Sequence, residues 1–211
     1  MRVGLPGCRA PWRLVLCAVA IAICFALPAA ASDITAPIEQ FDAGLLEIMK
    51  AGKAMPFQQR YDALAPLVLR AFNLDLILQG GIGSGWASLP RDQQAALTAA
   101  FQRYSIAICV ANFNDFSGQR FELTPPAPDT DPVVRVRIVP GTPDDPPHVL
   151  GYVMQPTSVG WKAADVTADG YISLVAVQQA EIRALMAMGG SAALLARLHQ
   201  KIVELSDGVL Q

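Results

Sequence analysis

The sequence has few of the residues from which catalytic and metal sites are usually built. It contains only two histidines, His148 and His199, and neither has further ligand-type residues at metal-binding spacing. The serine-hydrolase pattern G-x-S-x-G is absent because Ser84 stands one place too late. The dinucleotide pattern G-x-G-x-x-G is absent because Trp86 occupies the place of its last glycine. We therefore expect a protein that is not an enzyme and that has no metal or cofactor.

Cysteine is also scarce in most of the chain. Three of the four cysteines fall within residues 1–31, which leaves Cys109 alone in the remainder. One thiol cannot form an internal disulfide, so the fold has to rest on its hydrophobic core. Cys109 lies between Ile108 and Val110 in an apolar helical stretch, and we expect a buried, unreactive thiol there.

The first 31 residues have the pattern of a secretory signal peptide. Three arginines precede a wholly apolar run over 14–27, and small residues follow as far as Ala31. The run is shorter than the roughly 20 residues that a permanent membrane anchor needs. We predict cleavage near Ala31, a periplasmic location, and a single domain over 32–211.

Positive charge is in short supply once this segment is removed. The loss of its three arginines leaves 13 of the 16 basic residues against all 18 acidic ones, a net charge of −5. Nucleic-acid binding depends on clustered Lys and Arg that neutralise phosphates. The composition therefore predicts no nucleic-acid partner.

The rest of the chain shows helical periodicity, then strand alternation, then helical periodicity again. Apolar residues spaced by three and four predict helices that begin near 38 and 56, a short helix over 72–78, and a long helix over 90–116. A change to period two predicts four strands, over 119–124, 133–139, 149–155 and 161–167.

Two further helices are expected at the C-terminal end, over 174–188 and from 191 onward, with a break at Gly189-Gly190. The order of elements predicts an α+β fold. Its core would be a curved four-stranded, mainly antiparallel sheet with helices packed on the apolar face.

The C-terminal half carries a series of motifs in a fixed order. They are Tyr152-Val153-Met154, W-K-x-x-D-V from Trp161 to Val166, G-x-x-S-L-V from Gly170 to Val175, Gly189-Gly190, and L-L-x-x-L from Leu194 to Leu198. In this order the chain resembles the MlaC family, the toluene-tolerance-type periplasmic auxiliary proteins of lipid ABC transporters, which includes the hopanoid-associated HpnM branch. Phe72, Gly83, Trp86 and Gln93 agree with it, so that the resemblance covers most of residues 36–205.

The resemblance implies a fold with an apolar cavity that holds acyl chains while the head group stays outside. It implies a phospholipid or related amphiphile as cargo, and no catalytic residue. The partners it implies are an inner-membrane lipid ABC transporter complex and an outer-membrane lipid-transfer complex. Asn73 and Ala163-Ala164 depart from the usual family pattern, so the sequence leaves both the phospholipid and the hopanoid branch open.

We expect the cavity to lie between the long helix and the apolar face of the sheet. The expected lipid-binding residues are Trp86 at the mouth, Leu97, Phe101, Tyr104 and Ile108 on the long helix, and Phe121, Leu123, Val134, Val136 and Ile138 on the sheet. Trp161, Lys162 and Asp165 are expected to be structural rather than lipid contacts.

Two other classes of function remain open at this point. An α+β enzyme acting on a small apolar substrate would need an acid or base with a shifted pKa inside its pocket. A structural periplasmic adaptor would need a filled core and a large exposed apolar patch. The internal void and the titratable groups around it separate these alternatives from a carrier.

Overall fold

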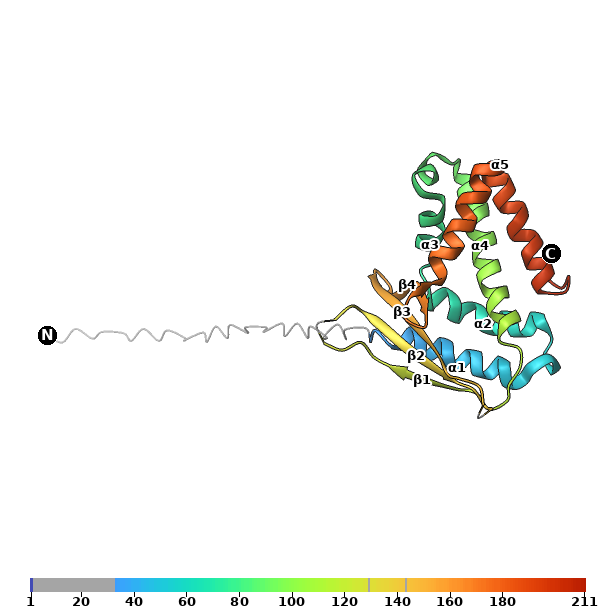
Figure 1. Cartoon of the computed structure of the whole chain (residues 1–211). Coiled ribbons are helices and arrows are strands. Elements are labelled where there is room, and N and C mark those ends of the chain that lie inside the picture. Colours follow the sequence, from blue (N-terminus) through green and yellow to red (C-terminus); the bar gives the residue numbers. More distant parts are fainter. Residues whose placement is uncertain (2–32, 129, 143) are drawn as a thin grey trace. The chain divides into compact units, whose positions relative to one another are not determined.

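A computed structural model describes Met1 and residues 33–128, 130–142 and 144–211 (Figure 1). The expected signal peptide and its cleavage point lie outside these ranges. From residue 33 onward the described chain belongs to one compact unit of α-helices and an antiparallel sheet, which confirms the predicted α+β class. Within the described residues, no helix combines the length and apolar character needed to cross a membrane.

In the part of the chain that the structure describes, four α-helices precede the sheet. They are α1 (Ala36–Ala51), α2 (Phe57–Ala71), α3 (Leu74–Ile82) and α4 (Arg91–Asn112), with 3₁₀ turns at Gly52–Ala54 and Gly83–Ser88. Apolar spacing explains the buried side of each helix. In α1, Ile38, Phe41 and Leu45 are buried on successive turns. The long predicted helix is confirmed as α4, although it ends at Asn112 rather than 116.

The sheet is an antiparallel meander with strand order β1-β2-β3-β4-β5. Its strands are β1 (Arg120–Thr124), β2 (Val133–Val139), β3 (His148–Thr157), β4 (Gly160–Ala168) and β5 (Ile172–Ser173). The described residues form five strands rather than the expected four, because β5 pairs with Thr167 and Ala168 of β4. A strand of two residues is too short to show alternation, and so the sequence pattern could not reveal it.

Alternation correctly assigned the faces of the longer strands. Val134 and Val136 of β2 have no exposed surface, whereas Arg135 and Arg137, which alternate with them, are exposed. The register continues this apolar face across the sheet, with Val134 opposite Tyr152 of β3 and Tyr152 opposite Val166 of β4. The same face therefore runs through three strands.

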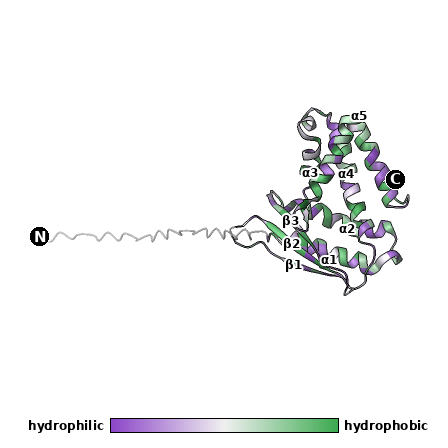
Figure 2. Cartoon of the chain, viewed as in Figure 1, coloured by the Kyte–Doolittle hydropathy of each residue, from purple (hydrophilic) through white to green (hydrophobic). Residues whose placement is uncertain are grey.

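The last helix, α5 (Leu174–Leu205), is bent at Gly189 and Gly190, where the backbone leaves helical φ and ψ. We refer to residues 174–188 as its first arm and 191–205 as its second arm. The bend confirms the predicted break. Figure 1 shows α5 beside α4, and it packs against α4, α3 and β4. Green and purple residues are interspersed along α4 and α5 in Figure 2, as expected for helices with one buried side.

Close packing of α3 on α5 explains one difference from the expected elements. The sequence predicted that the helix over 72–78 would break at Gly80, but α3 continues through Gly80 and Gly81 to Ile82. A Cβ atom at Gly81 would lie only 2.9 Å from the Ile182 side chain of α5. These glycines therefore act mainly by allowing the two helices to approach.

Candidate functional site

A cavity of about 460 Å³ lies between α4, the β3–β4 part of the sheet and the first arm of α5. Its volume falls in the range of about 300 to 1,000 Å³ that is usual for small-molecule sites. Most of the residues that line it are apolar or aromatic. The position between the long helix and the sheet is the one that we expected from the sequence.

The α4 wall follows from helical periodicity. Tyr104, Ile108 and Asn112 lie one turn apart on one side of α4, and Ser105 and Cys109 lie next to them. Tyr104 and Ser105 are buried, Ile108 and Cys109 are half-buried, and Asn112 is exposed. The wall therefore runs from a buried middle of the helix to its exposed C-terminal end.

The sheet wall follows from strand periodicity. Leu150 and Tyr152 are two residues apart in β3 and so point to the same side, and Val166 of β4 is paired with Tyr152. These three residues form the sheet side of the cavity.

Aromatic side chains close the inner end. Phe41 of α1 meets Phe72 edge-on, with ring centroids 5.1 Å apart, and the Phe72 ring lies 6.0 Å from that of Tyr152. Phe41 and Tyr152 are each only 3% exposed. Contacts of this kind add about 0.5 to 1.5 kcal/mol per pair beyond burial alone, so these rings stabilise the buried part of the cavity wall.

The cavity is open to solvent where the first arm of α5 borders it. Leu174 and Val177 line the cavity although they are 45% and 63% exposed. Gln178 and Glu181 lie on the same arm and also line the cavity. The cavity thus has an apolar interior and a partly polar mouth.

Residues of two sequence motifs hold this arm and the neighbouring strand in place. Asp165 accepts a hydrogen bond from the Ser173 hydroxyl at 2.9 Å, and Ser173 in turn accepts one from the Ala176 backbone N–H at 2.8 Å. The second bond caps the N-terminus of α5. Lys162 donates to the Leu69 carbonyl at 2.7 Å and so connects β4 to α2. Lys162 and Asp165 lie outside the lining and act as the structural residues that we expected.

The titratable groups of the inner lining favour their neutral forms. Burial raises the pKa of the Cys109 thiol to about 12, so that little nucleophilic thiolate exists at neutral pH. Burial, with smaller contributions from Asp42 and Cys109, raises the pKa of Tyr152 well above its ordinary value. The interior therefore suits an uncharged ligand segment.

One buried carboxyl group lies close behind this wall. Asp42 of α1 is 6% exposed, and its pKa is raised to about 7 by burial and by the neighbouring charge of Glu39. Its charge contributes to the raised pKa of Tyr152, although Asp42 itself is not among the lining residues. Asp42 has the shifted pKa that an acid or base needs, but it lacks a place in the cavity wall.

The structure distributes the ten expected lipid-binding residues over several places. Tyr104 and Ile108 line the cavity. Phe101 borders a separate small void, and Leu97 lies in a cleft with Ser191. Val134 and Val136 are fully buried in the core, and the remaining four, Trp86, Phe121, Leu123 and Ile138, are partly buried against it.

The sheet residues were assigned to the correct face, but the cavity lies over different strands. α5 packs on β4, and the void that it helps to enclose is bordered by β3 and β4 rather than β1 and β2. Sequence reasoning therefore missed Leu150, Tyr152 and Val166, although they continue the same apolar face. It also missed the first arm of α5, for which the apolar Leu174 and Val177 were the signal in the sequence.

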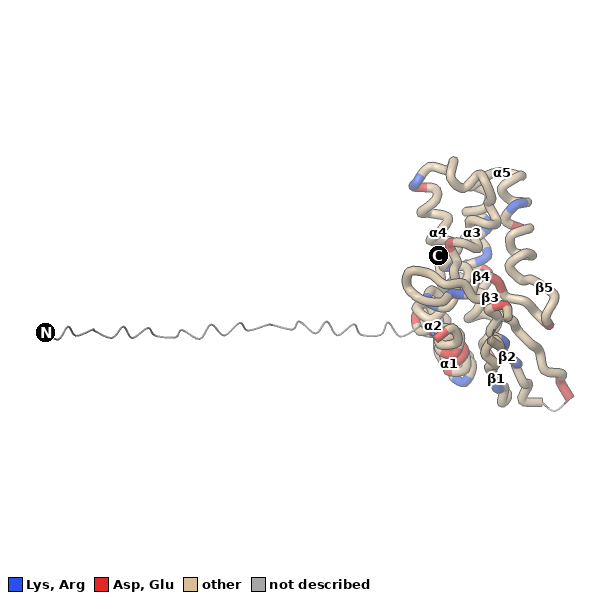
Figure 3. Tube along the Cα trace, turned by 90° about the vertical axis from the view of Figure 1, so that its left-hand side faces the viewer, with Lys and Arg blue, Asp and Glu red and all other residues tan. Residues whose placement is uncertain are grey.

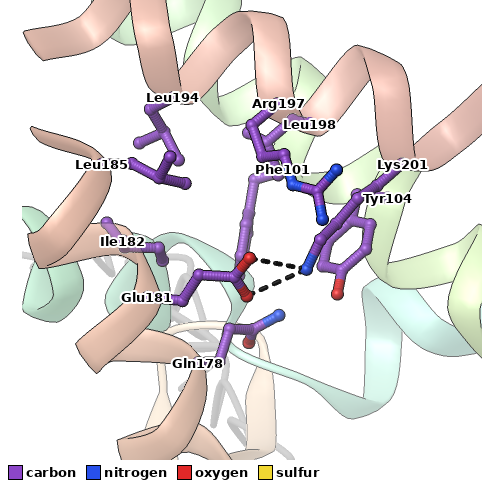
Figure 4. A pocket seen from close by; sticks show the side chains of 10 residues that line it. All are labelled: Phe101, Tyr104, Gln178, Glu181, Ile182, Leu185, Leu194, Arg197, Leu198 and Lys201. Atoms are coloured by element: carbon purple, nitrogen blue, oxygen red, sulfur yellow. Dashed lines mark hydrogen bonds and ion pairs between the residues drawn. The ribbon is translucent and has the colours of Figure 1, made fainter. Parts of the chain in front are cut away.

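The small void beside Phe101 holds only about 20 Å³, which is about the space for one water molecule. It lies between α4 and the two arms of α5, and Figure 4 shows its side chains. Tyr104, Gln178 and Glu181 line both this void and the main cavity, so the two are neighbours.

Two comparisons with known proteins give matches. A family model described as MlaC protein matches residues 39–200. Among solved structures, the phospholipid-binding protein from Ralstonia solanacearum, determined in complex with a phospholipid, is similar to this chain with a TM-score of 0.68 and 20% sequence identity. The match covers 83% of this chain and 99% of that one, and at this identity it shows a shared fold. No curated protein sequence matches.

Proposed function

This chain belongs to the MlaC family, and on that basis we propose that it is a phospholipid-binding protein which holds acyl chains in the cavity between α4, β3–β4 and the first arm of α5. The observation that carries the proposal is the cavity itself, which is about 460 Å³ in volume, mostly apolar, and open at one end. The phospholipid found with the similar Ralstonia solanacearum protein supports the same ligand class.

The energetics of lipid transfer explain why such a cavity is needed. A diacyl lipid carries on the order of 30 methylene groups, and each costs about 0.8 kcal/mol to expose to water. The total of roughly 24 kcal/mol prevents free movement through an aqueous compartment. An apolar cavity with a closed aromatic end replaces the bilayer interior, while its open end leaves the head group in water.

The finer part of the proposal concerns location and partners. In this proposal residues 1–31 are removed as a signal peptide, and residues 32–211 act as one lipid-binding domain in the periplasm. The protein then carries phospholipid, or a hopanoid-type lipid, between an outer-membrane lipid-transfer complex and an inner-membrane ABC transporter complex. The signal-like pattern of the first 31 residues and the family's general role support this part.

The two alternative classes fit the geometry less well. An enzyme would need its acid or base in the cavity wall, whereas the buried Asp42 lies outside the lining and Glu181 lies at the open end. A structural adaptor would need a filled core, which a void of about 460 Å³ argues against. Binding and transport therefore account for more of the described features than either alternative.

Mass spectrometry of lipid extracted from the purified protein tests the proposal. We expect about one phospholipid or related amphiphile per protein, released by organic solvent and reloaded from vesicles. Protein that carries no lipid after gentle purification, and takes up none from vesicles, would refute the proposed function.

A further inference from the structure

The mouth of the cavity contains an ionised side chain whose role the binding of acyl chains does not explain. Among the described residues that line the cavity, Glu181 is the one with a carboxylate. It lies on the first arm of α5, one turn beyond the exposed Val177, and its own side chain is 44% exposed. A lipid whose chains fill the cavity would place its head group beside this carboxylate.

A lysine from the second arm of α5 neutralises Glu181. The Lys201 ammonium lies 2.8 Å from one carboxylate oxygen of Glu181 and 2.9 Å from the other. Figure 4 shows this pair with Gln178 and Tyr104 beside it. The bend at Gly189-Gly190 returns the second arm alongside the first, and so brings together two residues that are 20 positions apart.

The lysine is also held in place by the cavity wall. Its ammonium lies 5.4 Å from the centre of the Tyr104 ring, and Tyr104 lines the cavity. Only 20% of the Lys201 side chain is exposed. Lys201 borders the small void and is not itself among the residues that line the cavity, but the Glu181 carboxylate and the Tyr104 ring that hold it both are, so its ammonium lies directly behind the cavity wall.

We propose that Glu181 and Lys201 form a head-group site that selects phospholipids carrying both a phosphate and an ammonium group over anionic phospholipids; this inference rests on the proposed function. Lys201 binds the phosphate and Glu181 binds the ammonium. When such a lipid binds, the ion pair between Glu181 and Lys201 is replaced by two ion pairs with the head group. Every charge of the protein and of the lipid then still has a partner of opposite sign.

An anionic head group cannot make the same exchange. Its phosphate can approach Lys201, but it brings no cation for Glu181, which is then left beside a negative ligand. Figure 3 shows that charged residues are distributed over most elements and that α5 carries both signs. The small void is also bordered by Arg197, whose guanidinium is paired with Glu204 at 3.8 Å rather than with Glu181. One partly exposed charge pair is worth at most about fivefold in affinity, which is the size of preference that we expect.

Competition between two lipids tests the inference directly. Purified protein stripped of lipid is incubated with vesicles of equimolar phosphatidylethanolamine and phosphatidylglycerol, separated from them, and its bound lipids are quantified by mass spectrometry. We expect the wild-type protein to carry the ethanolamine lipid in about two- to fivefold excess. Glu181→Gln should bring the ratio to unity or below, because Lys201 then favours the more negative ligand. Lys201→Met should not lower the ratio, because Glu181 remains.

The ion pair between Glu122 and Arg137 supplies a matched control. Its separation is 2.9 Å, close to that of the Glu181–Lys201 pair, and it lies on β1 and β2, whose residues do not line the cavity. The variant Glu122→Gln with Arg137→Met should keep the wild-type ratio. Head-group selection would be overturned if the wild-type protein bound the two lipids in the vesicle ratio or preferred phosphatidylglycerol. It would also be overturned if Glu181→Gln and the control shifted the ratio equally. Each of these results would leave the proposed function standing. Absence of any bound lipid in the wild-type protein would instead overturn the proposed function.

Discussion

Replacing Ile108 by tryptophan should fill the cavity without disturbing the core. Ile108 lines the cavity from α4 and is half-buried, so a larger side chain has free space in front of it. Isoleucine and tryptophan also have similar helix propensities, so α4 itself should be unaffected. We expect the melting temperature of the delipidated variant to equal or exceed that of the wild type, while lipid binding falls.

The size of both effects can be worked from the structure. An indole adds about six heavy atoms to the side chain and displaces about three to six chain methylenes, each worth about 0.8 kcal/mol, so binding weakens by roughly 2 to 5 kcal/mol. Val136 provides the contrast because it has no exposed surface and does not line the cavity. Val136→Trp should lose about 1 to 3 kcal/mol through overpacking. In a domain of this size, that lowers the melting temperature by about 2 to 12 °C.

The assay compares two quantities for each variant: the melting temperature after delipidation, and the moles of lipid recovered per mole of protein after expression. Delipidation is needed because bound lipid itself raises the apparent stability. If Ile108→Trp were destabilised as much as Val136→Trp, or still carried wild-type amounts of lipid, the cavity would lie elsewhere and the reasoning would fail.

Three further predictions concern separate parts of the chain. Because the folded-state pKa of Asp42 is raised to about 7 from 3.8, the folded protein keeps a proton that the unfolded chain has released, and stability falls as pH rises between these values. Asp42→Asn should therefore increase the free energy of unfolding by up to about 4 kcal/mol at about pH 8 and by little near pH 4, as measured by urea denaturation; an equal change at both pH values would contradict this. Cys109 lines the cavity, so maleimide labelling should be slower in lipid-loaded than in delipidated protein. Because burial raises the pKa of this thiol to about 12, the rates are compared at about pH 9, and equal measurable rates would place the chains away from it. N-terminal sequencing of exported protein should begin at Ser32, whereas an intact Met1 in the membrane would exclude cleavage.

Local periodicity determines much of the fold. The alternation of Val134 and Val136 with arginines assigned the buried face of β2 correctly, and helical spacing placed Tyr104 and Ile108 on one side of α4. Gly189-Gly190 was correctly predicted as the end of a helical segment. These features depend on near neighbours in the chain, and so the sequence pattern contains them.

The location of the cavity on that face depends on tertiary packing. Alternation shows that Val136 and Leu150 point inward, and the register pairs them directly. It does not show that Leu150 borders a void while Val136 is sealed in the core. That difference arises because α5 returns to pack on β4, a contact between elements whose pairing no local pattern encodes.

The environment of two charged residues also depends on tertiary packing rather than on local sequence. The sequence identifies Asp42 and Lys201 only as polar residues on helices, because an isolated periodicity does not specify which elements cover a side chain. Packing of α1 in the core buries Asp42 and raises the pKa of its carboxyl group, and the bend of α5 brings Lys201 to Glu181. The sequence by itself determined which side of each element is apolar. Only the tertiary structure decided which of those sides meet in the core and which enclose a cavity, because such contacts join residues that lie far apart in the chain.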